Sequence, residues 1–305
     1  MGNTNNVKDP EKKSQKDQVK EILEKLEQGV TELFESERYK EYLNCMSKFH
    51  NYSLNNTLLI AMQKPDATFV TGFHAWHDKH GRNVKKGEKG IKIFAPVKYK
   101  VTVDPEAPGE EPKEIEKTGF KVTYVWDISQ TEGKELPTIG VNELSGDVKD
   151  YDKLYRALRL ICPVPVEFGD IGGGSKGYYN DSEKLVMIKS GMSQVQTIKT
   201  LLHESAHAML HSKAAMDPDH PVDRRTMEVE AESIAFTVCK KYGMDTDDYS
   251  FGYIAGWSSD KDAKELKNSL ERIKDTADKM ITGIDKSIER QTIMEEAARN
   301  GDEGR

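Results

Sequence analysis

The sequence predicts a mixed α+β protein of two domains, an N-terminal α+β domain and a C-terminal domain that ends in a long helix. Segments with apolar residues at helical spacing alternate with short runs in which apolar residues alternate with polar ones. Between the two halves, residues 131–149 have no periodicity and contain Pro and Gly, so we expect a linker there. We therefore predict domains at residues 17–130 and 150–258, followed by a C-terminal helix at residues 260–299.

The N-terminal half is predicted to begin with helices and to continue into a hairpin. Apolar residues from Val19 to Phe34 recur every three or four positions, which predicts an amphipathic helix. An acidic, Pro-rich stretch at residues 105–117 is expected to be a loop between two strands with alternating apolar residues. The expected elements are helices at 17–34, 39–49, 53–62 and 73–80, and strands at 68–71, 91–103 and 120–126.

The C-terminal half is predicted to contain a short sheet and several helices. Its last helix is highly charged and has a narrow apolar stripe, formed by Leu266, Leu270, Ile273, Ala277 and Ile281. The expected elements are helices at 151–161, 194–211, 223–242 and 260–299, and strands at 164–168, 177–179 and 184–188.

Composition indicates a soluble protein, which we expect to be cytoplasmic. Hydrophobic residues make up 36% and charged residues 32% of the 305 positions. No apolar run approaches the roughly 18 residues that span a bilayer, and the three cysteines are scattered, as is typical of a reducing compartment. The net charge is −7, but the segment from Arg38 to Lys100 has 12 Lys and Arg against 4 Asp and Glu. An acidic protein with one basic segment favours a local anionic partner.

The segment TLLHESAHAMLH indicates a metal site. His203 and His207 are four residues apart on a predicted helix, so both rings point from one face toward a common point. Two imidazoles supply two corners of a tetrahedral Zn²⁺ site, and Glu204 lies where a general base can reach a metal-bound water. The alternatives are a charged helix with two histidines packed in a core, and a metal bound without turnover. His211, one turn later, is interpreted as a helix-terminal residue and not as a further ligand.

A third ligand is expected on the helix that begins near Asp223. Glu228 and Glu232 are four residues apart and share a face with Ala231 and Ala235, whose small side chains allow close approach of another helix, while Glu230 points elsewhere. We favour Glu228 as the ligand and Glu232 as the carboxylate that orients a ligand His through its other ring nitrogen. The sequence leaves open whether the ion is Zn²⁺ or another divalent metal.

The basic segment has the side chains that suit single-stranded nucleic acid. Lysines and an arginine can follow phosphates, aromatic rings can stack on unpaired bases, and asparagines can bond to base edges. The alternative is that the aromatic residues are core and the lysine turn is only a solvated hairpin tip. The candidate DNA-binding residues are Asn55, Asn56, Trp76, Arg82, Lys85, Lys86 and Lys89.

The segment YSLNN at Tyr52, the pair Trp76 and Gly81–Arg82, and the turn VKKGEKGI resemble the N-terminal single-stranded-DNA-binding domain of ArdC-like antirestriction proteins of plasmids and conjugative elements. The C-terminal half resembles the zincin-type domain that accompanies it. HESAHAMLH and EVEAESIAF are also similar to ImmA/IrrE metallopeptidases, in which HExxH is followed by an ExxA[ND] helix. Here Glu228 matches the ligand glutamate, whereas Glu232 replaces Asp or Asn, so the choice of third ligand stays open.

This resemblance implies a protein of a mobile genetic element that coats incoming single-stranded DNA and protects it from nucleases, with a zinc metallopeptidase-like domain. Two alternatives remain. The chain could be a zinc endopeptidase that cleaves a regulatory protein, or a non-catalytic DNA-binding module that zinc stabilises. We expect single-stranded DNA as a partner, a peptide or protein substrate under the second hypothesis, and no membrane. The oligomeric state is not determined by the sequence.

Overall fold

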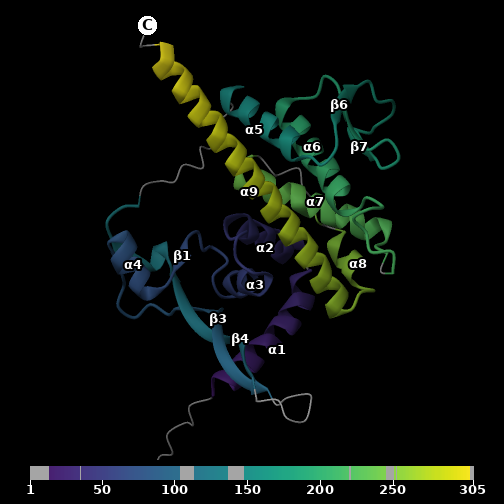
Figure 1. The fold of residues 1–305 in the computed structure, drawn as a ribbon. Coiled ribbons are helices and arrows are strands. Elements are labelled where there is room, and N and C mark those ends of the chain that lie inside the picture. The colour runs from purple at the N-terminus through teal and green to yellow at the C-terminus, as the bar shows by residue number, and fades with distance from the viewer. Residues whose placement is uncertain are drawn as a thin grey trace, which may run out of the picture.

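A computed structural model shows helices and small sheets in one mixed α+β arrangement (Figure 1). The structure describes residues 14–34, 36–103, 113–136, 148–219, 221–244, 251 and 253–302. The elements in chain order are α1 (Gln15–Leu33), α2 (Ser36–Lys48), α3 (Leu54–Gln63), β1 (Val70–Thr71), α4 (Phe73–His80), β2 (Arg82–Val84), β3 (Ile91–Val103), β4 (Lys113–Asp127), the 3-10 helix η1 (Ile128–Gln130), β5 (Thr131–Gly133), α5 (Val148–Ile161), β6 (Val166–Gly169), β7 (Gly177–Asn180), β8 (Leu185–Lys189), α6 (Gln194–Leu210), α7 (Arg224–Lys241), α8 (Ile254–Ser258) and α9 (Ala263–Asp302). The expected α+β class and long C-terminal helix are confirmed.

The N-terminal sheet is built on the long antiparallel hairpin of β3 and β4, with β1 on the other side of β4. Its register runs from Ile91 opposite Val125 to Val103 opposite Lys113. The predicted loop at 105–117 was too long, because β4 begins at Lys113 and residues 104–112 lie outside the described part. Cross-strand ion pairs such as Lys100–Glu114, at 2.9 Å, hold this exposed strand segment, which has too few apolar residues to be recognised by alternation.

The segment predicted to be a linker starts with structure that the sequence did not indicate. Residues 131–133 form β5, which pairs with β2 in a separate two-stranded sheet. A three-residue strand is too short for a periodic signal. Residues 137–147 of the predicted linker lie outside the described residues, and α5 begins at Val148.

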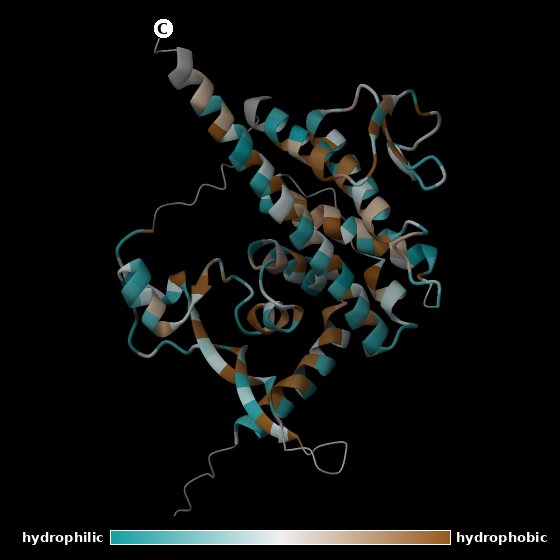
Figure 2. Cartoon of the chain, in the orientation of Figure 1, coloured by the Kyte–Doolittle hydropathy of each residue, from teal (hydrophilic) through white to brown (hydrophobic). Residues whose placement is uncertain are grey.

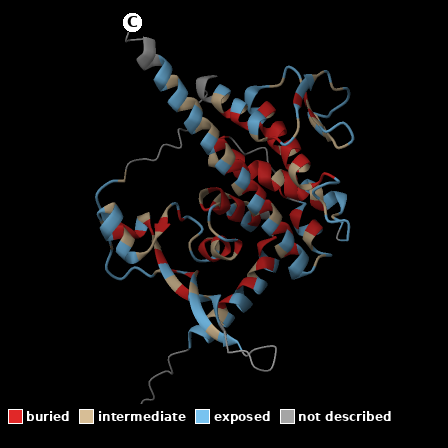
Figure 3. Cartoon of the chain, in the orientation of Figure 1, coloured by how far each residue is buried: buried red, intermediate tan, exposed pale blue. Residues whose placement is uncertain are grey.

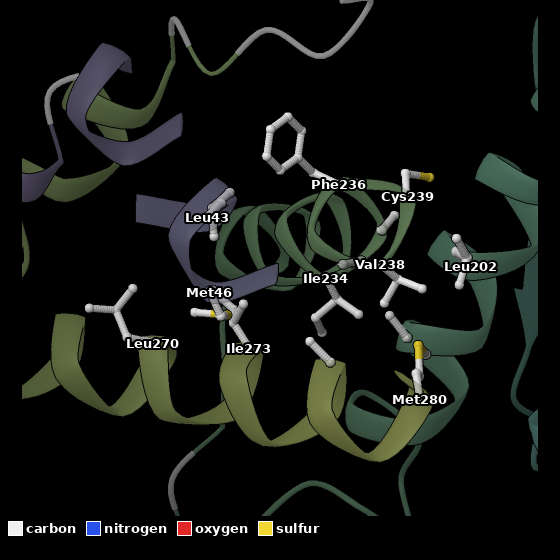
Figure 4. Packing of buried hydrophobic residues seen from close by; sticks show 14 of the residues in the cluster. Leu43, Met46, Leu202, Ile234, Phe236, Val238, Cys239, Leu270, Ile273 and Met280 are labelled. Carbon is white, nitrogen blue, oxygen red and sulfur yellow. The ribbon is translucent and has the colours of Figure 1, made fainter. Parts of the chain in front are cut away.

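Helix α7 lies at the centre of the C-terminal part. It packs against α2, α6 and α9, and from Val229 to Cys239 every residue except Glu232 is buried. Figure 4 shows Ile234 and Val238 of α7 facing Ile273 and Met280 of α9. The three-stranded sheet β6-β8-β7, in which β6 and β8 are parallel and β7 is an antiparallel edge strand, lies beside α6.

Helix α9 has 40 residues and crosses the molecule in Figure 1. Hydrophobic and hydrophilic residues alternate along it (Figure 2), and its apolar stripe is buried from Leu266 to Ile284. None of the described helices combines the length and the apolar character needed to cross a membrane.

The two predicted domains share a hydrophobic core. Buried residues concentrate on α2, α6 and α7 (Figure 3), and one continuous cluster includes Leu43 and Met46 of α2 together with Ile234 of α7 and Leu270 of α9. The hydroxyl groups of Tyr39 and Ser233 add a buried hydrogen bond of 2.8 Å between α2 and α7. The boundaries at 17–130, 150–258 and 260–299 stay a prediction, but the N-terminal helices rest directly on the helix that carries the glutamates of the candidate site.

Candidate metal centre

Two capped helices present the candidate ligands. The Ser193 side chain accepts a hydrogen bond from Gln196 at the start of α6, and the Asp223 side chain accepts one from Thr226 at the start of α7. On α6, His203 and His207 are one helical turn apart and face α7. Ala231 of α7 is fully buried, which agrees with a close approach between these helices.

His203, His207 and Glu228 form a group that could hold a metal ion. The Nε2 atoms of the two histidines are 3.1 Å apart. Oε2 of Glu228 is 3.4 Å from Nε2 of His203 and 3.7 Å from Nε2 of His207. Ligands about 2.1 Å from one tetrahedral ion lie about 3.4 Å from each other, so the donor set fits a single divalent cation.

Charge in this group also favours a cation. Burial opposes a positive charge on His203, but hydrogen bonds to Glu228 and Glu232 outweigh it and raise the pKa of His203 to about 10. Hydrogen bonds from His203 and His207 hold the pKa of Glu228 well below its usual value. Oε2 of Glu232 is 3.3 Å from Nδ1 of His203, which is the position that the predicted orienting role requires.

Glu204 lies beside this group in a cavity of about 1030 Å³ that both histidines and β7 line. Burial raises the pKa of Glu204, while the two histidines and the Tyr179 backbone act in the opposite direction. Strand β7 can pass this close to α6 only because residue 177 is glycine, where a Cβ atom would lie 2.6 Å from Cγ2 of Thr200 and 3.4 Å from Cγ of Glu204. A carboxylate of this kind can exchange a proton with a group held at the metal position.

The sequence interpretation missed a hydrogen-bonded chain behind His207. Nδ1 of His207 is 2.9 Å from Nδ1 of His211, and Nε2 of His211 is 3.0 Å from Oε2 of Glu230. The other carboxylate oxygen of Glu230 accepts hydrogen bonds from Ser269 and Arg272 of α9. His211 is the C-cap of α6, as expected, and its spacing of four from His207 was the only local signal for this contact.

Burial affects the pKa values of His211 and Glu230, the two ionisable groups behind His207. It lowers the pKa of His211, so the ring is neutral near pH 7. Burial favours the neutral form of Glu230 too, but hydrogen bonds from His211 and Arg272 outweigh it and lower the pKa of Glu230.

The structure places three of the seven predicted DNA-binding residues in structural contacts. Trp76 is fully buried and donates from Nε1 to the Trp126 carbonyl at 2.9 Å, so its ring is not available to a base. Asn56 bonds to both backbone groups of Phe94. The Arg82 guanidinium donates to the hydroxyl and the carbonyl of Thr131 in β5, and to the carbonyl of Lys134. Trp76 as a stacking residue stays a prediction, and in this conformation packing against the hairpin buries its ring.

The remaining predicted residues are more accessible. Lys85 is exposed and donates to the Ser129 carbonyl at 2.9 Å, and Asn55 is half-buried. Lys86 and Lys89 are exposed in the loop between β2 and β3, and no hydrogen bond or ion pair of their ammonium groups is seen among the described residues. Their DNA contacts stay a prediction.

An aromatic surface that the prediction did not select lies next to this loop. Phe73 and Tyr124 are 51% and 44% exposed, and both rings contact Trp126, with centroid distances of 5.6 and 6.4 Å. Lys92 is opposite Tyr124 in the hairpin register and is exposed beside it. We call Phe73, Lys92, Tyr124 and Trp126 the aromatic–lysine surface. Exposure does not alternate along β4, where Val122 and Val125 are buried and Tyr124 between them is exposed, so a period-two pattern would not have identified Tyr124.

Comparisons with known proteins identify a curated relative, two similar solved structures and a matching family model. An uncharacterized protein of Bacillus anthracis is 31% identical over 318 aligned residues, which cover 92% of this chain and 53% of that protein. The chain thus spans about half the length of that curated relative. The crystal structures of antirestriction ArdC protein from the R388 plasmid, metal-free and Mn(II)-bound, are similar at 18% identity with TM-scores of 0.48 and 0.44, covering 77% and 78% of this chain and 86% and 85% of those chains.

A family model described as the N-terminal domain of anti-restriction factor ArdC matches residues 12–126. The matched range includes α1, ends one residue before the end of β4, and contains all four residues of the aromatic–lysine surface. Residues 12–126 of this chain are therefore similar to the N-terminal domain of the anti-restriction factor ArdC.

Proposed function

We propose that this chain is a single-stranded-DNA-binding, antirestriction-type protein of a mobile element, with Zn²⁺ held by His203, His207 and Glu228. The aromatic–lysine surface carries the first part of this proposal, since it lies in the domain that matches ArdC. Phe73 and Tyr124 offer exposed rings on either side of the half-buried Trp126, and Lys92 adds a positive charge next to them. Unpaired bases can stack on such rings while lysines contact the phosphates.

The geometry of this surface favours single strands over duplex DNA. Bases in a duplex are stacked on each other and do not present their faces to protein rings. A Cβ atom at residue 90 would lie 2.8 Å from the Trp126 ring and 2.9 Å from Cβ of Tyr124, so glycine at this position leaves room for both side chains. The lysines of the adjacent loop, Lys86 and Lys89, extend the positive charge beyond the rings.

The test is binding to labelled single-stranded and duplex oligonucleotides across a salt series. We expect preference for the single strand, little dependence on base sequence, and affinity that falls with rising salt as counterions are released. Equal binding of both forms would contradict the stacking argument. Absence of binding at low salt would contradict the proposed function of the N-terminal half.

The second part of the proposal concerns the metal centre. A divalent ion held there supplies Lewis acidity toward a water or carbonyl oxygen. His203 and His207 bind through Nε2, Glu228 binds through its carboxylate, and Glu232 holds the His203 ring from the other nitrogen. Metal content by elemental analysis, with Zn²⁺ and Mn²⁺ offered in competition, tests the stoichiometry and the identity of the ion.

A peptidase that cleaves a regulatory protein is the second candidate function, favoured by the position of Glu204. This carboxylate is buried beside both histidines, and the edge strand β7, which can pair with an extended peptide, lines the same cavity. We expect Glu204→Gln to keep the metal and to lose any cleavage of a quenched fluorescent peptide library. If DNA protection survives in Glu204→Gln, proton transfer by this residue is not required for it. If no cleavage is detected and chelation unfolds the C-terminal part, the ion has the structural role of the third hypothesis.

A further inference from the structure

We propose that Arg272 on α9 is a positioning residue for the metal centre, which acts on the ring of His207 through Glu230 and His211. The proposal rests on the proposed metal binding by His203, His207 and Glu228. It adds a residue 65 positions beyond the HExxH motif to this site, and it gives the long C-terminal helix a role in metal binding.

The contacts form an unbroken path from α9 to the candidate ligand. Arg272 donates from Nε, at 2.9 Å, and from Nη2 to Oε1 of Glu230. Oε2 of Glu230 is 3.0 Å from Nε2 of His211, and Nδ1 of His211 is 2.9 Å from Nδ1 of His207. Nε2 of His207 is left to face His203 and Glu228.

One proton arrangement satisfies every member of this path with a neutral His211. Two donations from the Arg272 guanidinium favour an ionised Glu230, which can only accept, so Nε2 of His211 must carry a proton to bond to it. Nδ1 of a neutral His211 then accepts, so the proton of His207 is on Nδ1. The lone pair of His207 is consequently on Nε2, the atom that faces the other two ligands and that a cation requires.

Burial makes the path sensitive to the loss of Arg272. Glu230 has no exposed surface, and the side chain of His211 is 3% exposed, so a carboxylate without its cationic partner cannot turn to solvent. Leu270 and Ile273 of α9 are fully buried against the shared core and fix the backbone on both sides of Arg272. The Arg272 side chain itself is 34% exposed, so it can be replaced without opening a large cavity.

The two histidine ligands are thus held in different ways. The second nitrogen of His203 meets Glu232, which is on the same helix as the ligand Glu228 and is 34% exposed. The second nitrogen of His207 meets His211, whose side chain is 3% exposed, and the path continues through the fully buried Glu230 to Arg272 on another helix. Loss of the contact with α9 should therefore disturb the orientation of the His207 ring and leave that of His203 unchanged.

The test measures Zn²⁺ affinity of the full chain by calorimetry after removal of metal with a chelator. We expect Arg272→Gln to bind Zn²⁺ roughly 10- to 100-fold more weakly than wild type, as is typical when a group that orients a metal ligand is lost. Arg272→Lys, which keeps the charge but not the two-pronged geometry, should fall between them. The visible absorption spectrum of the Co²⁺-loaded protein should change in Arg272→Gln, since it reports ligand geometry.

A matched control separates this path from general loosening of α9. Asp278, also on α9, bonds to Nδ1 of His50 at 2.8 Å, away from the candidate metal ligands. We expect Asp278→Asn to leave Zn²⁺ affinity and the Co²⁺ spectrum unchanged. The double variant His211→Asn, Arg272→Gln should lose less Zn²⁺ binding free energy than the sum of the two single variants, because the two residues act through one path.

Three outcomes would overturn the proposal. Arg272→Gln could bind Zn²⁺ as tightly as wild type, Asp278→Asn could weaken binding as much as Arg272→Gln, or the double variant could be additive. Circular dichroism tests whether each variant is folded. If Arg272→Gln does not fold, the Zn²⁺ affinity of Arg272→Lys is compared with that of wild type instead. A wild-type chain that binds no divalent metal would instead contradict the proposed centre itself, and with it this role of Arg272.

Discussion

Replacing Tyr124 with alanine tests whether the aromatic–lysine surface binds DNA. The Tyr124 ring is 44% exposed and contacts Trp126 at a centroid distance of 6.4 Å, so its removal takes away a stacking face with little loss of core packing. A stacked base contributes roughly 1–3 kcal/mol by alanine substitution, which corresponds to about 5- to 150-fold in affinity. We expect Tyr124→Ala to weaken binding of a labelled single-stranded oligonucleotide by this factor in fluorescence anisotropy at one fixed salt concentration.

Tyr99→Ala is the matched control for this experiment. Tyr99 is 49% exposed on the same hairpin, but the register places it opposite Lys117, on the face that alternates with the one carrying Lys92 and Tyr124. We expect its removal to leave DNA affinity unchanged. The reasoning is refuted if Tyr124→Ala binds like wild type, or if Tyr99→Ala loses as much affinity as Tyr124→Ala.

Three further predictions follow from burial, capping and charge. Trp76→Ala should destabilise the N-terminal part by about 3–5 kcal/mol in urea denaturation, because it removes a fully buried ring and its hydrogen bond to the Trp126 carbonyl. A variant that keeps its stability but no longer binds DNA would instead indicate that Trp76 contacts DNA. Asp223→Ala should cost about 0.5–2 kcal/mol by loss of the α7 cap, and Asp223→Asn less, both measured by urea denaturation. Burial raises the pKa of Asp223, but hydrogen bonds from Thr226 and Lys261 outweigh it and lower the pKa to about 2. In the wild type, the contribution of ionised Asp223 to the free energy of unfolding is therefore present above the usual carboxyl pKa and is lost as pH falls through about 2. Because His203 has a pKa of about 10, its proton must leave when a metal binds. Zn²⁺ affinity should therefore rise by up to about tenfold per pH unit between about pH 6 and 8, and calorimetry in buffers of different ionisation enthalpy should detect about one proton released. Affinity that does not depend on pH would contradict this prediction.

Local periodicity predicted the elements whose side chains repeat clearly. Helix α4 and strand β3 have the expected bounds, Phe73–His80 and Ile91–Val103, because helical pitch and strand alternation act within a few residues. Strand β5 was missed because three residues are too few for a period, and the start of β4 was missed because charged cross-strand pairs replace apolar alternation there.

The DNA-binding prediction shows where composition is insufficient. Trp76 and Trp126 are the same residue type, yet packing buries the first completely and leaves the second half-buried beside the exposed rings of Phe73 and Tyr124. Arg82 and Asn56 similarly satisfy backbone groups of neighbouring strands. Which aromatic and polar groups remain available to a partner depends on the packing of whole elements, and no local pattern contains that information.

The sequence by itself determined the histidine pair and Glu204, since a four-residue spacing on one helix brings two rings to one point whatever the rest of the chain does. Only the tertiary structure decided how α7 and α9 complete the site. It places Glu228 at 3.4 Å from His203, Glu232 at the other ring nitrogen, and Glu230 on the path to Arg272. Contacts between residues 42 positions apart depend on how two helices pack, and helix packing is set by buried surfaces along their whole length rather than by any motif.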